Sequence, residues 1–318
     1  IIKDSTGNSS NGGSISQAIV NISGNKFTNT GSITASQEFT NSAANLENNN
    51  TITSNGSFTN TGNITGQGSI SANQGGTNTG SMTQNEVTTG GTFNNGDGTT
   101  AGTITTDKLT NNGTFTNNGS IIASTITNQT GKEFINNSGK EITAESFINQ
   151  GSVTNNGTIN AEITGNTGSL IISNGGTNSG TISQNIVSIT GGTLTNNNSI
   201  TANEFNNSAT ISGSGSLTVT TGNNSGNITQ DNVTINGDYT NTGTITSNNN
   251  FTNSGDISGD GGKLIVNNGS NSGSISQDTL ETSGTFENTG SIIADITNGG
   301  TFTNNGTVGT NQNKAEIT

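Results

Sequence analysis

One nine-residue pattern recurs along most of the chain and constrains its fold more than any other feature. Residues 115–123 read FTNNGSIIA, and close variants stand at 27–35, 58–66, 194–202, 239–247, 251–259, 286–294 and 302–310. An apolar residue leads, Asn follows two positions later, Gly usually four and a second apolar residue six. Even spacing places both apolar residues on one side of an extended chain. Because Asn and Gly tolerate left-handed backbone at bends, each copy predicts a strand, a corner and a strand.

The composition fits a thin repeated coil better than a compact core. Only 24% of the 318 residues are hydrophobic and 4% are aromatic, which would suit a disordered chain. Disorder does not require apolar residues at fixed intervals, whereas each coil of a solenoid buries only a few of them. The chain has no Pro, and no helical apolar period persists beyond a turn. These features predict an all-β solenoid of roughly 18 coils.

A second marker, Ile-Ser-Gln or a variant, divides the chain into longer repeats. It stands at 15–17, 82–84, 182–184, 228–230 and 275–277, and the last two spacings are 46 and 47 residues. We therefore expect one elongated domain, 1–318, with coils over about 13–308 and internal repeats 14–80, 81–180, 181–226, 227–273 and 274–318.

Within these repeats the inward Ile positions step by unequal intervals. The long steps, such as Ile182 to Ile200, contain an additional apolar pair and are expected to be full coils. The short steps, such as Ile200 to Ile211, are short coils or parts of wider ones. The Lys-Glu insertions that lengthen Phe134–Ile142 predict a bulged corner or small protrusion.

The pattern assigns particular residues to the core and to the corners. The expected inward residues are Phe27, Phe58, Phe115, Phe147, Tyr239, Phe251, Phe286 and Phe302, with Ile33, Ile121, Ile182, Ile200, Ile228 and Ile275. The expected corner residues are Asn29, Asn60, Asn117, Asn196, Asn241, Asn253, Asn288 and Asn304. Stacked in register, these Asn side chains would form amide ladders; otherwise they would tolerate the bend and point to solvent.

The motif apolar-x-Asn-x-Gly-x-Ile-x-Ala, with a short apolar pair before the next copy, resembles the repeats of filamentous-haemagglutinin-like adhesins. The resemblance covers roughly residues 13–308. It implies a right-handed parallel β-helix at the bacterial cell surface or outside the cell. The chain departs from the family in its less uniform coil length and its high Asn and Thr content.

Charge and missing residue types exclude several functions. The net charge of −13, with seven basic residues, argues against nucleic acid and anionic membranes as partners. The absence of His, Arg and Cys excludes Ser-His-Asp and Cys-His catalysis and zinc sites built on His or Cys. No apolar run is long enough for a membrane span, so we expect no membrane insertion.

Three weaker site candidates remain. Asp231 and Asp278 each follow a marker Gln and are the best carboxylates for a polysaccharide lyase or hydrolase. The glycine turns Asn94–Gly98 and Ser258–Gly262 resemble calcium-binding turns but do not repeat. Outward Thr pairs flanking inward Ile suggest an ice-binding face, although many pairs contain Ser, Asn or Asp instead. Solvated polar residues of a repeat explain all three, so we assign no catalytic, cofactor or metal residue.

We therefore expect a non-catalytic structural or adhesive β-helical rod, with a host or cell-surface glycan or protein as a possible ligand. The alternatives are a carbohydrate-active β-helix enzyme, an ice-binding solenoid and a phage fibre segment. Coils with unpaired strand edges at both ends would let subunits join end to end into a filament, and residues 311–318 resume an alternating pattern. The other explanation is that the chain is a piece of a longer β-helix.

Overall fold

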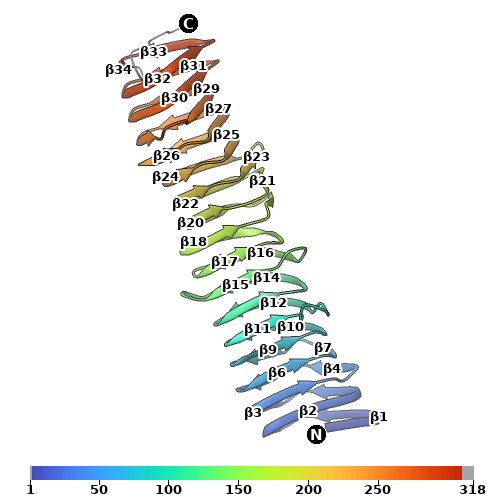
Figure 1. Ribbon diagram of the computed structural model, residues 1–318. Coiled ribbons are helices and arrows are strands. Elements are labelled where there is room, and N and C mark those ends of the chain that lie inside the picture. The colour runs from blue at the N-terminus through green and yellow to red at the C-terminus, as the bar shows by residue number, and fades with distance from the viewer. Residues whose placement is uncertain (1, 310–318) are drawn as a thin grey trace. The chain divides into compact units, whose positions relative to one another are not determined.

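The chain folds as a parallel β-solenoid. The computed structural model describes residues 2–309, with the side chains of 9–309 except that of residue 166, and this part contains strands and turns but no helix. Each strand pairs with strands of neighbouring coils, and every pairing with a described register is parallel (Figure 1). The predicted all-β solenoid is therefore confirmed, with about 17 turns.

The chain divides into two compact units, Ile1–Thr164 and Gly165–Thr318. The first holds β1 (Ile2–Asn11), β2 (Ser14–Asn29), β3 (Ser32–Asn41), β4 (Asn45–Asn48), β5 (Thr51–Ser54), β6 (Ser57–Asn60), β7 (Asn63–Thr65), β8 (Ser69–Ala72), β9 (Gly75–Asn78), β10 (Ser81–Thr89), β11 (Thr92–Asn95), β12 (Thr103–Asn111), β13 (Thr114–Asn117), β14 (Ser120–Asn128), β15 (Glu133–Asn136), β16 (Glu141–Asn149) and β17 (Ser152–Asn155). Strand β18 (Thr158–Ile172) crosses the boundary. The second holds β19 (Gly176–Asn178), β20 (Ile182–Ile189), β21 (Thr193–Asn196), β22 (Ser199–Asn207), β23 (Thr210–Ser212), β24 (Ser216–Asn224), β25 (Asn227–Ile235), β26 (Tyr239–Asn241), β27 (Thr244–Asn253), β28 (Asp256–Ser258), β29 (Lys263–Asn271), β30 (Ser274–Thr282), β31 (Thr285–Asn288), β32 (Ser291–Asn298), β33 (Thr301–Asn304) and β34 (Thr307–Gly309).

Each coil of the first unit has three faces, and each face contributes one inward residue to a column that runs through the core. We call the faces A, B and C. Face A carries Phe27, Leu46, Ile64, Met82, Ile104, Ile121, Ile142 and Ile159. Face B carries Ile33, Ile52, Ile70, Val87, Leu109, Ile126, Phe147 and Ile163. Face C carries Val20, Phe39, Phe58, Gly76, Phe93, Phe115, Phe134 and Val153.

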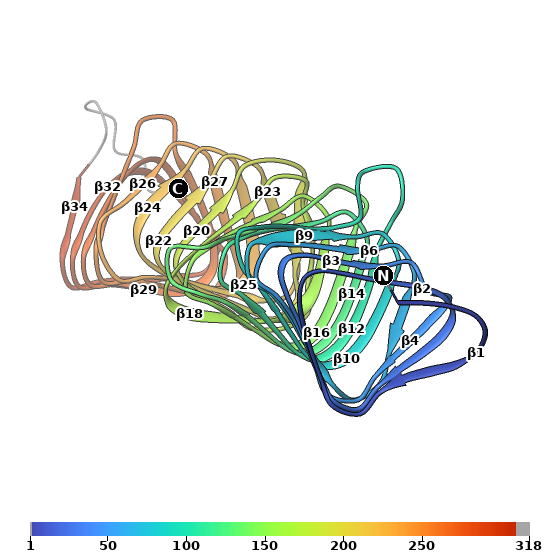
Figure 2. The same cartoon turned by 90° about the horizontal axis from the view of Figure 1, so that it is seen from below.

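The second unit has three faces of its own, D, E and F. Face D carries Leu194, Ile211, Ile228, Ile245, Leu264, Leu280 and Ile296. Face E carries Ile182, Ile200, Leu217, Val233, Phe251, Gly269, Phe286 and Phe302. Face F carries Val187, Phe205, Gly222, Tyr239, Ile257, Ile275, Ile292 and Val308. Figure 2, which looks along the stack of coils, shows successive coils of each unit as nested loops.

The predicted core residues are inward and buried, apart from the half-buried Phe302 in the last described coil. Phe rings of adjacent coils stack on face C, with centroids 5.5 Å apart for Phe93 and Phe115 and 4.7 Å apart for Phe115 and Phe134. The long steps of the sequence are full coils, as predicted, because Ile182 pairs with Ile200. The short steps are parts of coils, since Ile211 lies on a different face and pairs with Ile228.

The predicted corner Asn residues all end their strands, next to the bends. Their side chains point inward and form the amide ladders. In the longest, Asn95 Nδ2 donates to Asn117 Oδ1 at 2.9 Å, and Asn117 Nδ2 donates to Asn136 Oδ1 at 2.8 Å. Asn304, in the last described coil, is exposed but still accepts from Asn288 at 2.7 Å. The alternative of solvent-facing Asn is wrong, because the inward amides satisfy one another and the corner backbone.

The prediction that the motif glycines adopt left-handed backbone is wrong. Gly31, Gly119 and Gly290 are not among the positive-φ glycines. A Cβ atom at Gly119 would instead collide with the carbonyl oxygen of Gly102 in the preceding coil. Glycine is needed here because backbones of successive coils approach too closely for any side chain.

Three of the five marker Gln residues, Gln84, Gln230 and Gln277, end amide ladders. At three places a Gln reaches across a glycine of the intervening coil to an Asn two coils earlier. Asn48 donates to Gln84 across Gly66, Asn196 to Gln230 across Gly213, and Asn241 to Gln277 across Gly259. The last two bonds are both 2.6 Å long. Because glycine has no side chain, the intervening coil leaves a space in the ladder. The Gln side chain is longer than that of Asn and fills this space.

The sequence repeat does not match the coil. Repeat 227–273 contributes eight residues to the core columns, one fewer than three full turns: Ile228, Val233, Tyr239, Ile245, Phe251, Ile257, Leu264 and Gly269. The markers of the second unit therefore begin on different faces, with Ile182 on E, Ile228 on D and Ile275 on F.

The Lys-Glu insertions form two tight turns, which confirms the expected protrusion. Lys132 N donates to Gln129 O at 3.0 Å, and Lys140 N donates to Asn137 O at 3.1 Å. Gly131 and Gly139 have φ values of 71° and 70°, so these two turns do use left-handed glycine. The alternating segment 315–318 lies outside the described residues.

Candidate functional site

Four successive strands of the first unit, β10, β12, β14 and β16, bend at the same corner between faces A and B. Each nine-residue strand contains a slip in its alternation, where two consecutive residues face outward. The slips fall at 85–86, 107–108, 124–125 and 145–146. Because the strands pair in register, the bends stack directly on one another. A bend of this kind bows the strand without ending its pairing.

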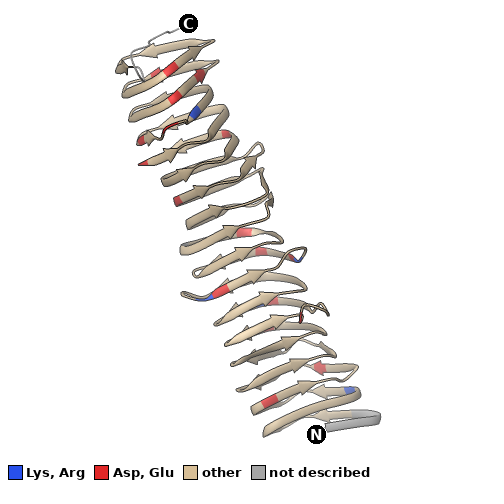
Figure 3. Cartoon of the chain, in the orientation of Figure 1, with Lys and Arg blue, Asp and Glu red and all other residues tan. Residues whose placement is uncertain are grey.

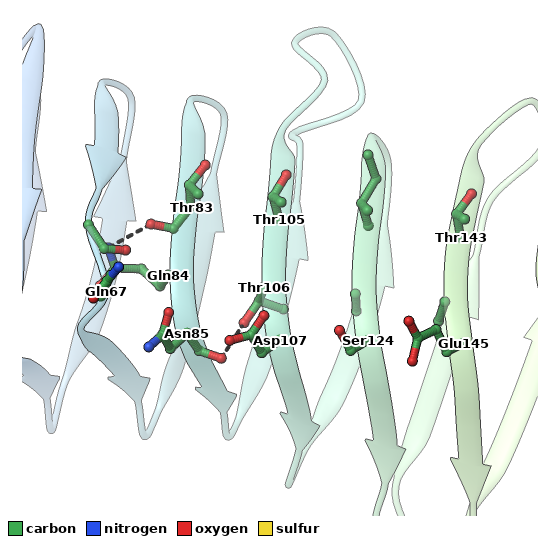
Figure 4. Close-up of a pocket in the computed structure, with 14 residues that line it drawn as sticks. Gln67, Thr83, Gln84, Asn85, Thr105, Thr106, Asp107, Ser124, Thr143 and Glu145 are labelled. Carbon is green, nitrogen blue, oxygen red and sulfur yellow. Dashed lines mark hydrogen bonds between the residues drawn. The ribbon is translucent and has the colours of Figure 1, made fainter.

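The stacked bends form a groove with a volume of about 530 Å³. Figure 4 shows two rows of side chains crossing the strands, with Thr83, Thr105 and Thr143 in one row and Asn85, Asp107, Ser124 and Glu145 in the other. The inward residues at the bend are small in the later coils, namely Thr106, Ala123 and Ala144. The remaining lining residues are Gly66, Gln67, Gln84 and Ile122.

The ionisable side chains of the groove are acidic. Asp107 and Glu145 are exposed and stand at equivalent positions two coils apart, with Ser124 between them. Lys108, the next residue after Asp107, points to the neighbouring face and donates to Glu86 Oε1 at 2.9 Å. Ile122 is 52% exposed and places an apolar side chain in the row of threonines. The groove is thus polar and acidic, with one apolar contact near its middle.

The structure does not bring the carboxylates expected from the sequence together. Gln230 follows face D and Gln277 follows face F, so Asp231 and Asp278 lie at different corners of the coil. Among residues 9–309, apart from residue 166, no three acidic residues are close enough to hold a metal ion. Figure 3 shows the acidic residues distributed along both units.

The two glycine turns have structural explanations. In the Asn94–Gly98 turn, Asp97 Oδ1 accepts from the Thr99 and Thr100 amides at 2.9 and 2.7 Å. These hydrogen bonds, led by Thr100, lower the pKa of the Asp97 carboxyl below its usual range. In the Ser258–Gly262 turn, Gly259 is the residue that Gln277 spans, and Asp260 is exposed.

Face E carries a run of outward hydroxyls in a single column. On face E, Ser183, Thr201, Thr218, Thr234, Thr252 and Ser270 follow one another without interruption. The neighbouring outward column consists of Ser199, Ser216, Asn232, Asn250 and Asn268. Face E therefore presents one hydroxyl column beside a mixed Ser and Asn column, and two adjacent Thr columns do not form there.

Among the described residues, three side chains carry a buried polar atom without a hydrogen-bond partner, namely Asn21, Thr110 and Tyr239. Only Tyr239 belongs to one of the core columns. Tyr239 pairs with Gly222 of the preceding coil on face F, and its hydroxyl makes no hydrogen bond. Burial raises the pKa of this phenol far above its usual range. The hydroxyl is enclosed within the core, so a role in a site is not supported.

Sequence reasoning missed the groove, although a signal was present. The face A and face B column residues on either side of the bend are five positions apart in each of the four strands, as in Met82 to Val87 and Ile142 to Phe147. Motif corners use a spacing of six, as in Phe115 to Ile121. A run of five-residue spacings at matched positions predicts stacked bends and hence a hollow.

The comparisons with known proteins add no relative. The chain matches no protein-family model, no curated protein and no solved structure. Its fold defines it as a parallel β-solenoid, while its likeness to filamentous-haemagglutinin-like repeats rests on the sequence pattern alone. Within residues 2–309, no helix exists that is long and apolar enough to cross a membrane.

Proposed function

We propose that this chain is a non-catalytic structural or adhesive module that acts outside the cell or on a bacterial cell surface. The observation that supports this proposal is the use of inward positions for apolar columns and amide ladders, which leaves outward Ser, Thr and Asn at regular intervals. On face B, for example, Thr34, Thr53 and Ser71 occupy equivalent positions in successive coils. Many weak contacts repeated along one surface suit adhesion, because linked contacts reinforce one another.

Adhesion is tested with beads that carry the purified full chain. We expect the beads to be retained on cells or surfaces that display glycans or proteins, and soluble chain to compete with them. Beads carrying an unrelated acidic protein of similar charge serve as the control. Equal retention of both bead types on every surface would contradict the adhesive role.

We extend the proposal to end-to-end association into a filament. Strands β33 and β34 pair with β31 and β32 on one side, and a second chain would add its own coil on the other. Such a contact does not close on itself and therefore propagates. Light scattering after size-exclusion chromatography, with electron microscopy at high concentration, should show chains of subunits; a monodisperse monomer at all concentrations would contradict association.

The carbohydrate-active enzyme remains the second candidate because Asp107 and Glu145 line one groove. A general acid of a glycosidase usually lies in an apolar pocket, whereas both carboxylates here are exposed. We therefore expect no product release from a panel of neutral and acidic polysaccharides. Release that disappears in Asp107→Asn or Glu145→Gln would establish the enzyme instead.

A further inference from the structure

The groove between faces A and B crosses four strands whose register keeps it at one corner. In the second unit such slips stay at one corner for at most three strands, namely β20, β22 and β24, then β25, β27 and β29, with three outward residues in β27. Strand β30 contains a slip and β32 contains none. In the first unit, the four strands β10, β12, β14 and β16 keep one corner. A groove that crosses successive strands suits a linear ligand lying along the stack of coils.

The charge of the groove selects the ligand's chemistry. Asp107 and Glu145 are its only ionisable lining residues, and the adjacent Lys108 bonds to Glu86 on the next face. Anionic polymers would meet two carboxylates and no base. A ligand with protonated amines would instead gain charge-assisted hydrogen bonds.

The spacing of the carboxylates selects a periodic ligand. Asp107 and Glu145 are two coils apart, which corresponds to roughly 10 Å at the usual strand spacing. In an extended β-1,4-linked polysaccharide, alternate sugars present the same edge, so like groups recur over two sugars, a similar distance. Thr105 and Thr143 on the opposite wall offer hydroxyls to the sugars, and the exposed Ile122 offers an apolar contact to a ring face.

Two other ligand classes fit less well. A single divalent cation needs several oxygen ligands within about 2.6 Å, and carboxylates two coils apart do not provide them. Nucleic acid carries the same charge sign as the groove.

We propose that this groove binds a linear β-1,4-linked polysaccharide that carries free amino groups. Asp107 and Glu145 bind amines of alternate sugars, and the threonine row with Ile122 contacts the intervening chain. This inference rests on the proposed adhesive function and names the ligand class for it.

Calorimetric titration of the full chain with a hexamer of β-1,4-linked glucosamine at mildly acidic pH tests the proposal. The comparison ligands are the fully N-acetylated hexamer and a neutral β-1,4-linked glucose hexamer. We expect the glucosamine hexamer to bind at least about tenfold more tightly than either, which corresponds to about 1.4 kcal/mol. Equal affinity for all three, or no binding of the amino form, would overturn the proposal.

The double variant Asp107→Asn/Glu145→Gln should lose at least about tenfold in affinity for the glucosamine hexamer. The matched control, Asp231→Asn/Asp278→Asn, removes the same charge from outward positions elsewhere and should bind like the parent chain. An equal loss in both variants would mean that net charge alone attracts the ligand, and would overturn the groove assignment. If beads of the parent chain adhere to cells while the hexamer fails to bind, the proposed function stands and this inference fails.

Discussion

At the scale of single residues, the inward amide is the most specific device in this chain. Asn117 accepts from Asn95, donates to Asn136, and also accepts the Gly119 amide at 3.2 Å. Each amide therefore serves two neighbouring coils and its own corner. The amide contributes to stability mainly because buried polar groups would be unpaired without it, and less through the net energy of the bonds that it forms.

Replacing Asn117 by Ala should lower the free energy of unfolding by about 1–3 kcal/mol, because it leaves Asn136 Oδ1 and the Gly119 amide without their donor and acceptor. Chemical denaturation of the purified protein measures this loss. Thr116→Ala, one residue earlier on the outward side of β13, is the control and should change stability by under about 0.5 kcal/mol. Similar losses in both variants would mean that the ladder adds nothing specific.

The unpartnered hydroxyl of Tyr239 gives a prediction of opposite sign. Tyr239→Phe keeps the ring beside Gly222 and removes a buried polar atom that has no hydrogen bond. Stability should rise by about 1 kcal/mol, or at least not fall. A clear fall in the midpoint of denaturation would show that the hydroxyl has a partner in solution.

At the scale of the strand and its corner, close backbone approach decides which residues are allowed. Gly119→Ala should destabilise by about 1–3 kcal/mol, because its Cβ would meet the carbonyl of Gly102 in the preceding coil. Gly13→Ala is the matched control, since no atom lies within 4 Å of a Cβ there. Thermal unfolding of both variants should separate them; equal midpoints would mean that the coils move apart easily.

The elements also show how far the sequence alone could predict this molecule. The even spacing of Phe115, Asn117 and Ile121 correctly predicted strand, corner and inward side chains, because period-two alternation and a buried core impose it. The reason for glycine at the corner was wrong, because the contact with the preceding coil is invisible in a local pattern. The groove was missed for a related reason: Asp107 and Glu145 are 38 positions apart in the sequence and meet only through the coil register.

At the scale of the whole molecule, the repeat rather than the coil is the unit that preserves local contacts. Deleting 227–273 would put Ile275 in the place of Ile228 and let Gln277 span Gly213 to reach Asn196, as Gln230 does. We therefore expect this deletion to leave a cooperatively folded solenoid. Deleting 227–262 removes two whole coils, so every later residue stays on its own face. This deletion, however, puts Val266 at the position of Gln230, and Asn196 loses its acceptor.

Circular dichroism and denaturation midpoints of the two deletions check this expectation. The shorter chain from the repeat deletion should be the more stable of the two, because Asn196 keeps its acceptor. A higher midpoint after deletion of 227–262 would mean that face identity matters more than the Gln-Gly-Asn contact.

A chain that grows by copying this repeat turns its surface as it grows. Its eight core-column residues fall one short of three turns, so each copy presents its outward residues on the next face of the coil. An outward residue that favours ligand binding returns to its original face only after three further copies of the repeat. Duplication of this repeat alone therefore distributes such a residue over all faces of the coil. A straight binding surface along the stack of coils requires a longer segment such as 81–180, in which the bends of successive coils lie at the same corner.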